Sequence, residues 1–237
     1  MLTLFRRIRR TLVSENRFSK YLVYAVGEIV LVVIGILIAL QINNWNNESN
    51  DRKKEAIILK QIHSDFKSNK KQLDSIVRIN QKKLNAIKVF IDKLLVHPDS
   101  SAIDTLIKYS NDIYTIKTFN PSNGAVEALI NSSSFELIQN DSLRNLLVSW
   151  QDVYEDYAEE EQLERKYQLH YFTPFLRKNI NFLRPYSKLN LETIKTVEFQ
   201  NTFLDKRLLG SFVLEAIEEE KINYYIDEIV RLSKNDD

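Results

Sequence analysis

The chain has 237 residues, of which 33 are basic and 32 acidic, and it contains no cysteine. The lack of cysteine excludes disulfides, thiol nucleophiles, cysteine-ligated zinc and iron–sulfur clusters, and the scarcity of glycine and proline, four of each, favours long helices over phosphate-binding loops. Beyond residue 42 there remain 27 basic and 30 acidic residues, a balance that argues against a nucleic-acid partner.

The first segment, residues 1–17, places apolar side chains at helical spacing with arginines between them. The apolar residues are Leu4, Phe5, Ile8 and Leu12, and the basic residues expected at the membrane surface are Arg6, Arg7, Arg9 and Arg10. This pattern predicts a cytoplasmic amphipathic helix that lies on the membrane next to the span. A charged tail without regular structure is the alternative.

The stretch Tyr21–Ile42 is the most apolar part of the chain. A helix rises about 1.5 Å per residue, so this stretch measures roughly 33 Å and matches a hydrocarbon core of about 30 Å. With its flanks it predicts a transmembrane helix over residues 18–45, and the lipid bilayer is its first partner. The basic excess before the span places the N-terminus in the cytoplasm and residues 46–237 on the far side, which is the periplasm if the membrane is a Gram-negative inner membrane.

A basic start followed by an apolar stretch also describes a cleaved signal peptide. The exit of this stretch, QINNWNNES, has no small-x-small cleavage site. Trp45 on that side, with Tyr21 and Tyr24 on the other, has the character of an interfacial anchor. These features favour an uncleaved signal anchor and a single-pass topology.

Glu28 is the one ionisable residue inside the apolar stretch. Gly35 and Ala39 follow it at i+7 and i+11 and share its helical face. A carboxyl group in hydrocarbon is costly, and small residues let helices approach closely, so this stripe predicts packing against a second copy or a membrane-protein partner. Two alternatives remain: Glu28 snorkels to the headgroups past Tyr24, or it takes part in proton or ion translocation.

Helical periodicity continues through most of the chain and predicts an all-α fold, with a long helix after the span followed by an extracytoplasmic bundle. Asn69 and Asn80 interrupt the apolar seam of the long helix, which favours a bundle helix over a coiled coil. We expect Ser101 and Ser133 to begin capping boxes, Pro174 to kink or restart a helix and Gly210-Ser211 to separate two helices. The expected helices span residues 48–96, 101–117, 141–172, 190–209 and 211–233, with a further helix of about nine residues that ends at Ile130.

Residues 18–46, FSKYLVYAVGEIVLVVIGILIALQINNWN, resemble a family of uncharacterised single-span membrane proteins of Bacteroidota, known only as a domain of unknown function. Residues 128–147, ALINSSSFELIQNDSLRNLL, resemble a second motif of that family. The resemblance implies an inner-membrane location and a helical extracytoplasmic domain. It implies no activity.

Signatures of catalysis are missing from the sequence. His63, His97 and His170 lie far apart without a zinc-protease or di-iron pattern, and no nucleotide-binding or serine-hydrolase motif occurs. We therefore expect no catalytic residue, no metal site and no cofactor.

Two clusters on the 141–172 helix each have two interpretations. The acidic run Glu155, Asp156, Glu159, Glu160, Glu161 and Glu164 is expected to be a solvated face, with a calcium site as the alternative. The aromatic residues Trp150, Tyr154 and Tyr157, with Tyr167 and Tyr171, form either core or a ligand groove, and their helical spacing favours core.

Three functions follow in order of preference. The first is a non-enzymatic, membrane-anchored protein whose helical domain binds a partner protein or stabilises a membrane complex. The second is a ligand-sensing helical module that signals through a partner, because about 20 residues before the span hold no output domain of their own. An enzyme is the third.

Overall fold

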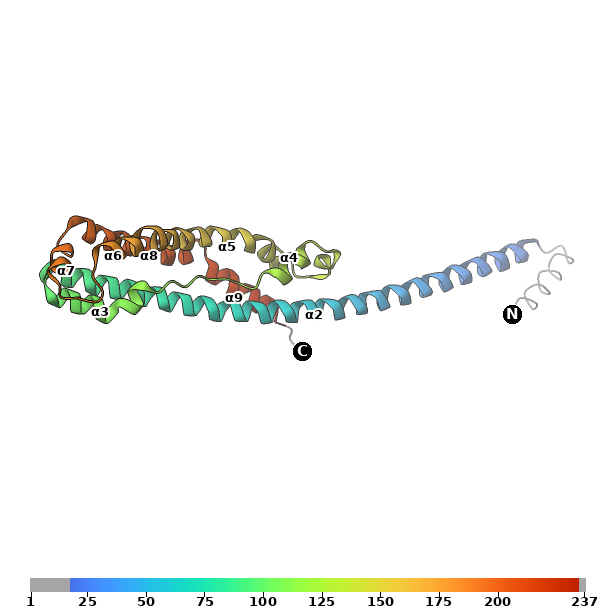
Figure 1. The fold of residues 1–237 in the computed structure, drawn as a ribbon. Helices are drawn as coiled ribbons and strands as arrows, with labels where there is room; N and C mark the ends of the chain where they lie inside the picture. The colour runs from blue at the N-terminus through green and yellow to red at the C-terminus, as the bar shows by residue number, and fades with distance from the viewer. Residues whose placement is uncertain (1–17, 235–237) are drawn as a thin grey trace. The chain divides into compact units, whose positions relative to one another are not determined.

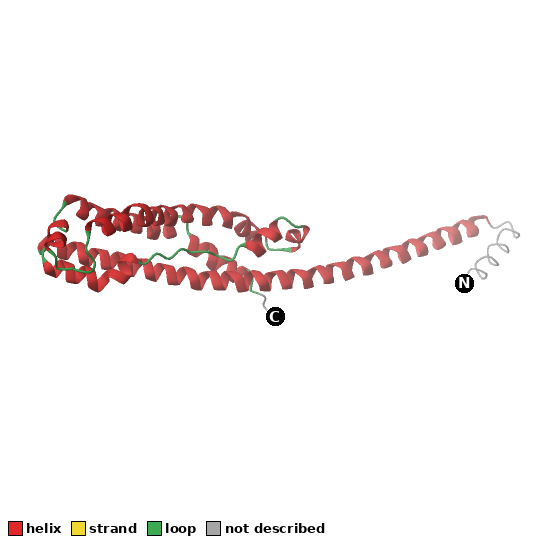
Figure 2. Ribbon diagram, viewed as in Figure 1, coloured by secondary structure: helices red, strands yellow, loops and turns green. Residues whose placement is uncertain are grey.

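Helices make up all the regular structure of residues 18–234, the part of the chain that the computed structural model describes (Figures 1 and 2). The all-α prediction is confirmed, with no strand in this range. The α-helices are α2 (Phe18–Val96), α3 (Ser100–Tyr114), α4 (Gly124–Ile130), α5 (Asp141–Tyr167), α6 (Thr173–Asn179), α7 (Lys188–Thr193), α8 (Val197–Glu219) and α9 (Ile222–Leu232). A 3₁₀ turn, η1 (Ser133–Leu137), and a π-helical turn, η2 (Gln168–Phe172), complete the set.

The chain divides into two units, residues 1–54 and 55–237. In the first unit, the described structure is the N-terminal part of α2. The second unit is a helical bundle, in which α5 packs against α8 and α9 beside the remainder of α2. The predicted helix over residues 48–96 is confirmed, because α2 is helical throughout that range.

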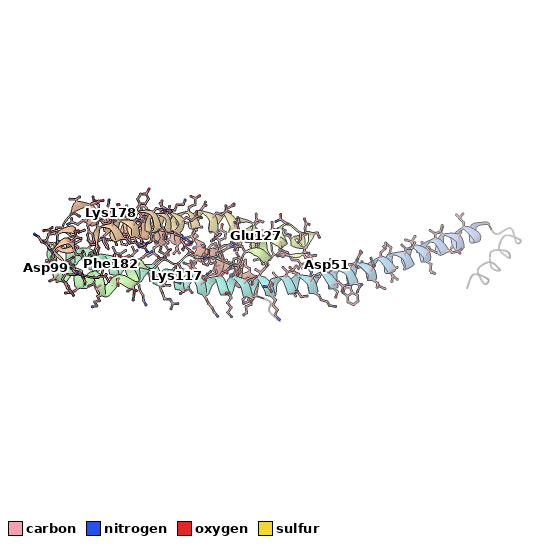
Figure 3. The ribbon with its side chains drawn as sticks, viewed as in Figure 1. Asp51, Asp99, Lys117, Glu127, Lys178 and Phe182 are labelled. Carbon is pink, nitrogen blue, oxygen red and sulfur yellow. The ribbon has the colours of Figure 1, made fainter. Side chains whose placement is uncertain are left out.

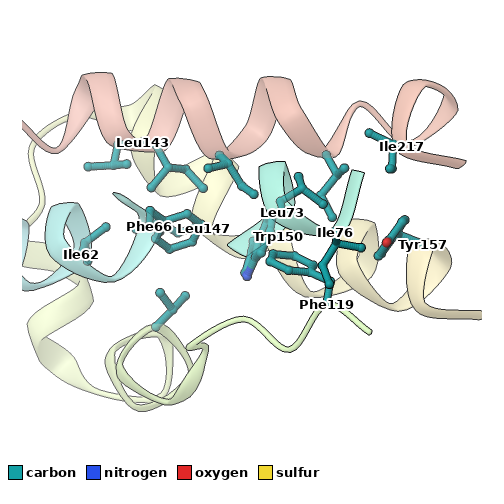
Figure 4. Packing of buried hydrophobic residues seen from close by; sticks show 14 of the residues in the cluster. Ile62, Phe66, Leu73, Ile76, Phe119, Leu143, Leu147, Trp150, Tyr157 and Ile217 are labelled. Carbon is teal, nitrogen blue, oxygen red and sulfur yellow. The ribbon is translucent and has the colours of Figure 1, made fainter. Parts of the chain in front are cut away.

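The bundle buries apolar side chains in two clusters. In the first, residues from α2, α5, α8 and α9 surround Phe66 and Trp150, whose ring centroids lie 5.1 Å apart in an edge-to-face contact (Figure 4). In the second, Phe90 of α2 lies against Phe199 and Phe203 of α8, with ring centroids 6.2 and 4.6 Å away. Such aromatic pairs contribute about 0.5–1.5 kcal/mol each beyond the burial of their area.

An extended strap, residues 115–123, connects α3 to α4 and runs along α2 (Figure 2). It begins earlier than predicted, because α3 ends at Tyr114 and not at residue 117. Phe119 inserts its ring into the first cluster, and the side-chain oxygen of Asn69 accepts a hydrogen bond from the Ser122 amide at 2.9 Å. Asn69 therefore interrupts the apolar seam in order to satisfy the backbone of the strap.

The predicted caps are displaced by one or two residues. The helix α3 is capped by Asp99, whose carboxylate accepts from the Ser101 amide at 2.8 Å, and Ser101 is already helical. Ser132 and not Ser133 caps the turn η1. In both places the side chain of an earlier residue accepts a hydrogen bond from a free amide at the helix start.

The predicted break at Gly210-Ser211 is wrong, since α8 runs through both residues to Glu219. A β-carbon on Gly210 would lie 2.9 Å from Cδ2 of Leu84, so glycine is present for close packing of α8 against α2. The true break is at Lys221, whose φ of 53° is left-handed and ends the helical path.

Pro174 lies at the start of α6, directly after the π-helical turn η2. Proline has no amide to donate and its ring crowds the preceding turn, so the backbone widens before it. The predicted irregularity at Pro174 is therefore present as a π-helical turn, after which the chain continues as α6. The predicted helix over residues 141–172 corresponds to α5 and η2 together.

Candidate functional site

The apolar N-terminal part of α2 exposes its side chains. An 18-residue window within it has a mean hydropathy of 2.6, and none of this window is buried. A core helix of a soluble protein would bury such a face, because apolar side chains gain about 25 cal/mol for each Å² removed from water. By length and composition, α2 is the one helix of residues 18–234 that can cross a membrane.

The stripe Glu28, Gly35 and Ala39 lies on one face of this part of α2, as the helical geometry requires. Glu28 is half-buried, and a β-carbon added to Gly35 would meet no atom within 4 Å. Trp45 is largely exposed. Tyr21 and Tyr24 lie in α2 with side chains outside the described set, and Arg6, Arg7, Arg9 and Arg10 lie outside the described residues.

The aromatic residues proposed as core or groove belong to the core. Trp150 and Tyr157 are buried in the first cluster, and Tyr154 packs against it, so the groove interpretation is wrong for these three residues (Figure 4). The indole of Trp150 donates to the side-chain oxygen of Asn123 at 2.7 Å, and the hydroxyl of Tyr154 donates to the carbonyl of Phe119 at 3.4 Å. These polar tips hold the middle of the strap, at Phe119, and its C-terminal end, at Asn123, against α5.

A layer of buried charges separates the two apolar clusters. We call it the buried charge layer and define it as Lys83 of α2, Glu161 and Glu164 of α5, and Lys206 of α8. The Lys83 ammonium donates to both oxygens of Glu164, at 2.5 and 2.6 Å, and the Lys206 ammonium donates to one of them at 2.9 Å. Lys206 also lies over the ring of Phe172, 5.6 Å from its centroid.

Glu161 joins this layer to the strap. Its carboxylate accepts from the amide of Phe119 at 2.9 Å and from the hydroxyl of Tyr157 at 2.5 Å. It lies one helical turn before Glu164 on the same face of α5. The prediction of a solvated acidic face is therefore wrong for Glu161 and Glu164, while Glu155, Asp156 and Glu159 of the same run are exposed.

The electrostatics of the layer follow from burial and pairing. Burial is the main cause that raises the pKa of Glu161 to about 7, against the hydrogen bonds from Tyr157 and Phe119. Burial also works to raise the pKa of Glu164, but Lys206 and Lys83 outweigh it and hold that pKa below its ordinary value. Burial lowers the pKa of Lys206 to about 8 in spite of Glu164. With all four groups ionised the layer is neutral.

Perturbed pKa values often mark active sites, but this layer is sealed. Lys83 and Lys206 are 1% and 0% exposed, and each of the two glutamates is 5% exposed. A substrate has no access to these groups in this conformation. The arrangement instead favours one register of α2, α5 and α8, because the ammonium groups of Lys83 and Lys206 both pair with the carboxylate of Glu164.

The sequence did hold a signal for the two glutamates. On α5 the residues Trp150, Tyr157, Glu161 and Glu164 follow the 3-4 spacing of one buried seam. Lys83 and Lys206 carry no such local signal, because their burial follows from the packing of α2 and α8 against α5.

The histidines do not converge. His63 is half-buried rather than at the surface, and its Nδ1 lies 2.9 Å from the carbonyl oxygen of Val230. His97 follows the end of α2, and His170 lies in η2. Within residues 18–234, no group of three or more histidine, aspartate or glutamate side chains is placed to hold a metal ion.

The comparison with known families matches residues 28–182 to DUF6090, a family of unknown function. This match covers well over half of the chain. The chain belongs to DUF6090. The match to DUF6090 begins inside the apolar part of α2 and ends just after α6, so it includes Lys83, Glu161 and Glu164 but not Lys206. No curated protein and no solved structure matches the chain.

Proposed function

We propose that this member of DUF6090 is a non-enzymatic, single-pass protein of the inner membrane that works by binding. Its N-terminus lies in the cytoplasm, and its periplasmic helical domain binds a partner protein or stabilises a membrane complex. The fully exposed apolar window of α2 supports the membrane anchor, because only lipid or another apolar helix removes that surface from water. The basic segment before it supports the orientation.

The observation that carries the binding proposal is the stripe Glu28, Gly35 and Ala39 on α2. An ionised carboxyl inside hydrocarbon costs a few kcal/mol on insertion scales, and the small residues Gly35 and Ala39 let a neighbouring helix approach closely enough to shield this face from lipid. The open space around Gly35 leaves room for such a helix to approach closely. A second copy of the chain or another membrane protein fits this stripe.

A binding role also agrees with the closed interior of the bundle. The strongest group of perturbed side chains, the buried charge layer, is out of reach of a substrate. Its charges pair with one another and with the backbone of the strap, so they hold the fold together. We infer that the domain offers surfaces and no catalytic centre.

Mass measurement of the full-length chain in detergent, with pull-down of the tagged protein, tests this function. We expect a stoichiometric oligomer or a stoichiometric partner. The substitutions Glu28→Leu, Gly35→Leu and Ala39→Leu should weaken this association. Gly27→Leu is the matched control, since Gly27 is equally open but lies off the stripe. A strictly monomeric particle without a partner contradicts the proposal, and equal loss with Gly27→Leu contradicts the role of the stripe.

A further inference from the structure

The segment that runs from the last turn of α6 through the following loop into the first turn of α7 presents apolar and basic side chains together. We call residues 177–189 the basic apolar loop. It contains four basic residues and no acidic one: Arg177, Lys178, Arg184 and Lys188. Leu183 is 95% exposed, and Phe182, Tyr186 and Leu189 are each more than half exposed. Lys178 and Phe182 lie at the same end of the bundle as Asp99, which caps α3 (Figure 3).

The backbone of this loop is fixed by polar contacts. Asn190 is buried, and its amide nitrogen donates to the carbonyls of Asn181 and Pro185 at 3.0 and 2.9 Å. Its side-chain oxygen accepts from the Asn181 amide at 2.8 Å. The side-chain oxygen of Asn181 in turn accepts from the amides of Leu183 and Arg184, each at 3.1 Å. The loop is therefore held in place without burying Phe182 or Leu183.

Exposed apolar side chains on an ordered loop gain no free energy of burial, because their area stays in water. In a loop fixed by asparagines they add nothing to the folded core. The exposed position of Phe182 and Leu183 is explained if these side chains insert into an apolar medium outside the chain. The loop resembles in this respect a preorganised binding element, whose ordering cost is met before it binds.

The charges of the loop indicate the nature of the partner. Arg177, Lys178 and Arg184 form no ion pair within residues 18–234, and Lys188 lies 3.7 Å from Glu192 at a highly exposed position. The nearby carboxylate of Asp104 accepts from the hydroxyl of Tyr186 at 2.6 Å. The loop therefore keeps a positive excess for an anionic partner.

We propose that the basic apolar loop docks on a bilayer surface rich in anionic phospholipid, with Phe182 and Leu183 entering the interface and Arg177, Lys178 and Arg184 contacting headgroups. A protruding side chain such as Leu183 fits a fluid interface, which needs no matching pocket. An acidic protein would have to provide a complementary surface of about 800 Å². Apolar residues beside lysine and arginine are the combination that binds membrane surfaces. This role depends on the helical bundle alone and goes beyond association through α2.

A single label tests the insertion, because the chain has no cysteine of its own. Leu183→Cys carries an environment-sensitive NBD dye in the full-length protein held in nanodiscs of phosphatidylcholine. Added vesicles of phosphatidylglycerol should shift the emission to the blue and increase it, and vesicles of phosphatidylcholine should not. A second arm places the protein in phosphatidylglycerol proteoliposomes, so that contact with its own bilayer is also detected. The same dye at Glu159→Cys, an exposed site on α5, is the control.

Unlabelled variants test the charges by co-flotation of the nanodiscs with phosphatidylglycerol vesicles. The triple variant Arg177→Glu, Lys178→Glu, Arg184→Glu should bind roughly a hundredfold more weakly, given the usual contribution of each basic residue near an anionic surface. The matched control reverses three exposed lysines of α2, by Lys67→Glu, Lys71→Glu and Lys82→Glu, and should bind as the wild type does. Phe182→Ser with Leu183→Ser should also weaken binding.

The proposal is overturned if the dye at residue 183 is unchanged in both arms. It is overturned equally if the triple variant floats as well as the wild type, since the basic N-terminal segment would then account for the binding. A blue shift with soluble polyglutamate and none with vesicles would assign the loop to an acidic protein instead.

Discussion

The apolar part of α2 and the buried charge layer reverse the usual distribution of residues. In the first, a run of leucine, isoleucine and valine is exposed along its whole length. In the second, four ionisable side chains lie in the interior of the helical bundle. Apolar side chains left in water and charged side chains removed from water are both unfavourable, so each arrangement requires a specific environment.

The difference lies in where that environment comes from. The charge layer is self-sufficient, because two lysines and two glutamates, with Tyr157 and the amide of Phe119, satisfy one another inside a single chain. Within residues 18–234, nothing buries the apolar window of α2. The buried layer therefore stabilises a fold, and the exposed span calls for a membrane or a partner.

The largest effect is expected from removing the common acceptor of the layer. Glu164→Gln leaves two buried ammonium groups without a carboxylate and should lower the free energy of unfolding by about 3–5 kcal/mol. Denaturation followed by Trp150 fluorescence measures this in a Trp45→Phe background, since the chain has only two tryptophans. Glu159→Gln, on the exposed side of α5, is the control.

Replacing the whole charge set provides the complementary measurement. Lys83→Met, Glu164→Leu and Lys206→Met together leave no unpaired charge and should restore most of the stability lost in Glu164→Gln. If the triple variant is as unstable as Glu164→Gln alone, pairing of these three charges is not what holds the layer together.

A charge placed in the span should prevent membrane integration. Val32→Arg puts a guanidinium near the middle of the apolar stretch, at a cost of about 3 kcal/mol on insertion scales, or roughly a hundredfold in the insertion equilibrium. Extraction with alkaline carbonate measures the integrated fraction. Ile57→Arg is the control, because Ile57 is also an exposed residue of α2 but lies in the bundle unit. Equal integration of both variants would count against a transmembrane role.

The raised pKa of Glu161 predicts a pH dependence of stability. Its pKa is about 7 in the folded chain and near 4.5 when unfolded, so between these values only the folded chain holds the proton. Stability should therefore fall as the pH rises from about 4.5 to about 7, by up to about 3 kcal/mol. Glu161→Gln should flatten this slope and Glu159→Gln should retain it. Lys206 acts in a separate window, adding stability as the pH rises above about 8.

The smallest effect concerns the contact of Gly210 with Leu84. Gly210→Ala gains about 1 kcal/mol of helix propensity but drives a methyl group against Leu84, so the two effects should nearly cancel. In a Leu84→Ala background the same change should stabilise the chain by about 1 kcal/mol. A double-mutant cycle of thermal unfolding measures the coupling, and identical effects in both backgrounds would show that the contact does not matter.

Much of the fold was predictable from the sequence, because its signals are local. The sequence predicted the long helix over 48–96 and a short helix that ends at Ile130, and both are present, the second with seven residues. The break at Gly210 was wrong because glycine signals both a turn and a close helix contact, and only the position of Leu84 separates the two. The strap begins at residue 115, earlier than predicted, and its path depends on distant contacts, because the amide of Phe119 in the middle of the strap donates to Glu161 of α5.

The candidate site divides in the same way. The apolar stretch, Glu28 and the basic segment are properties of consecutive residues, and the sequence alone determined them because hydropathy adds up along the chain. The burial of Glu164 was decided only by the tertiary structure, because its two ammonium partners lie 81 and 42 residues away. A carboxylate on a helix is solvated until distant residues enclose it, and no local pattern fixes where Lys83 and Lys206 will lie.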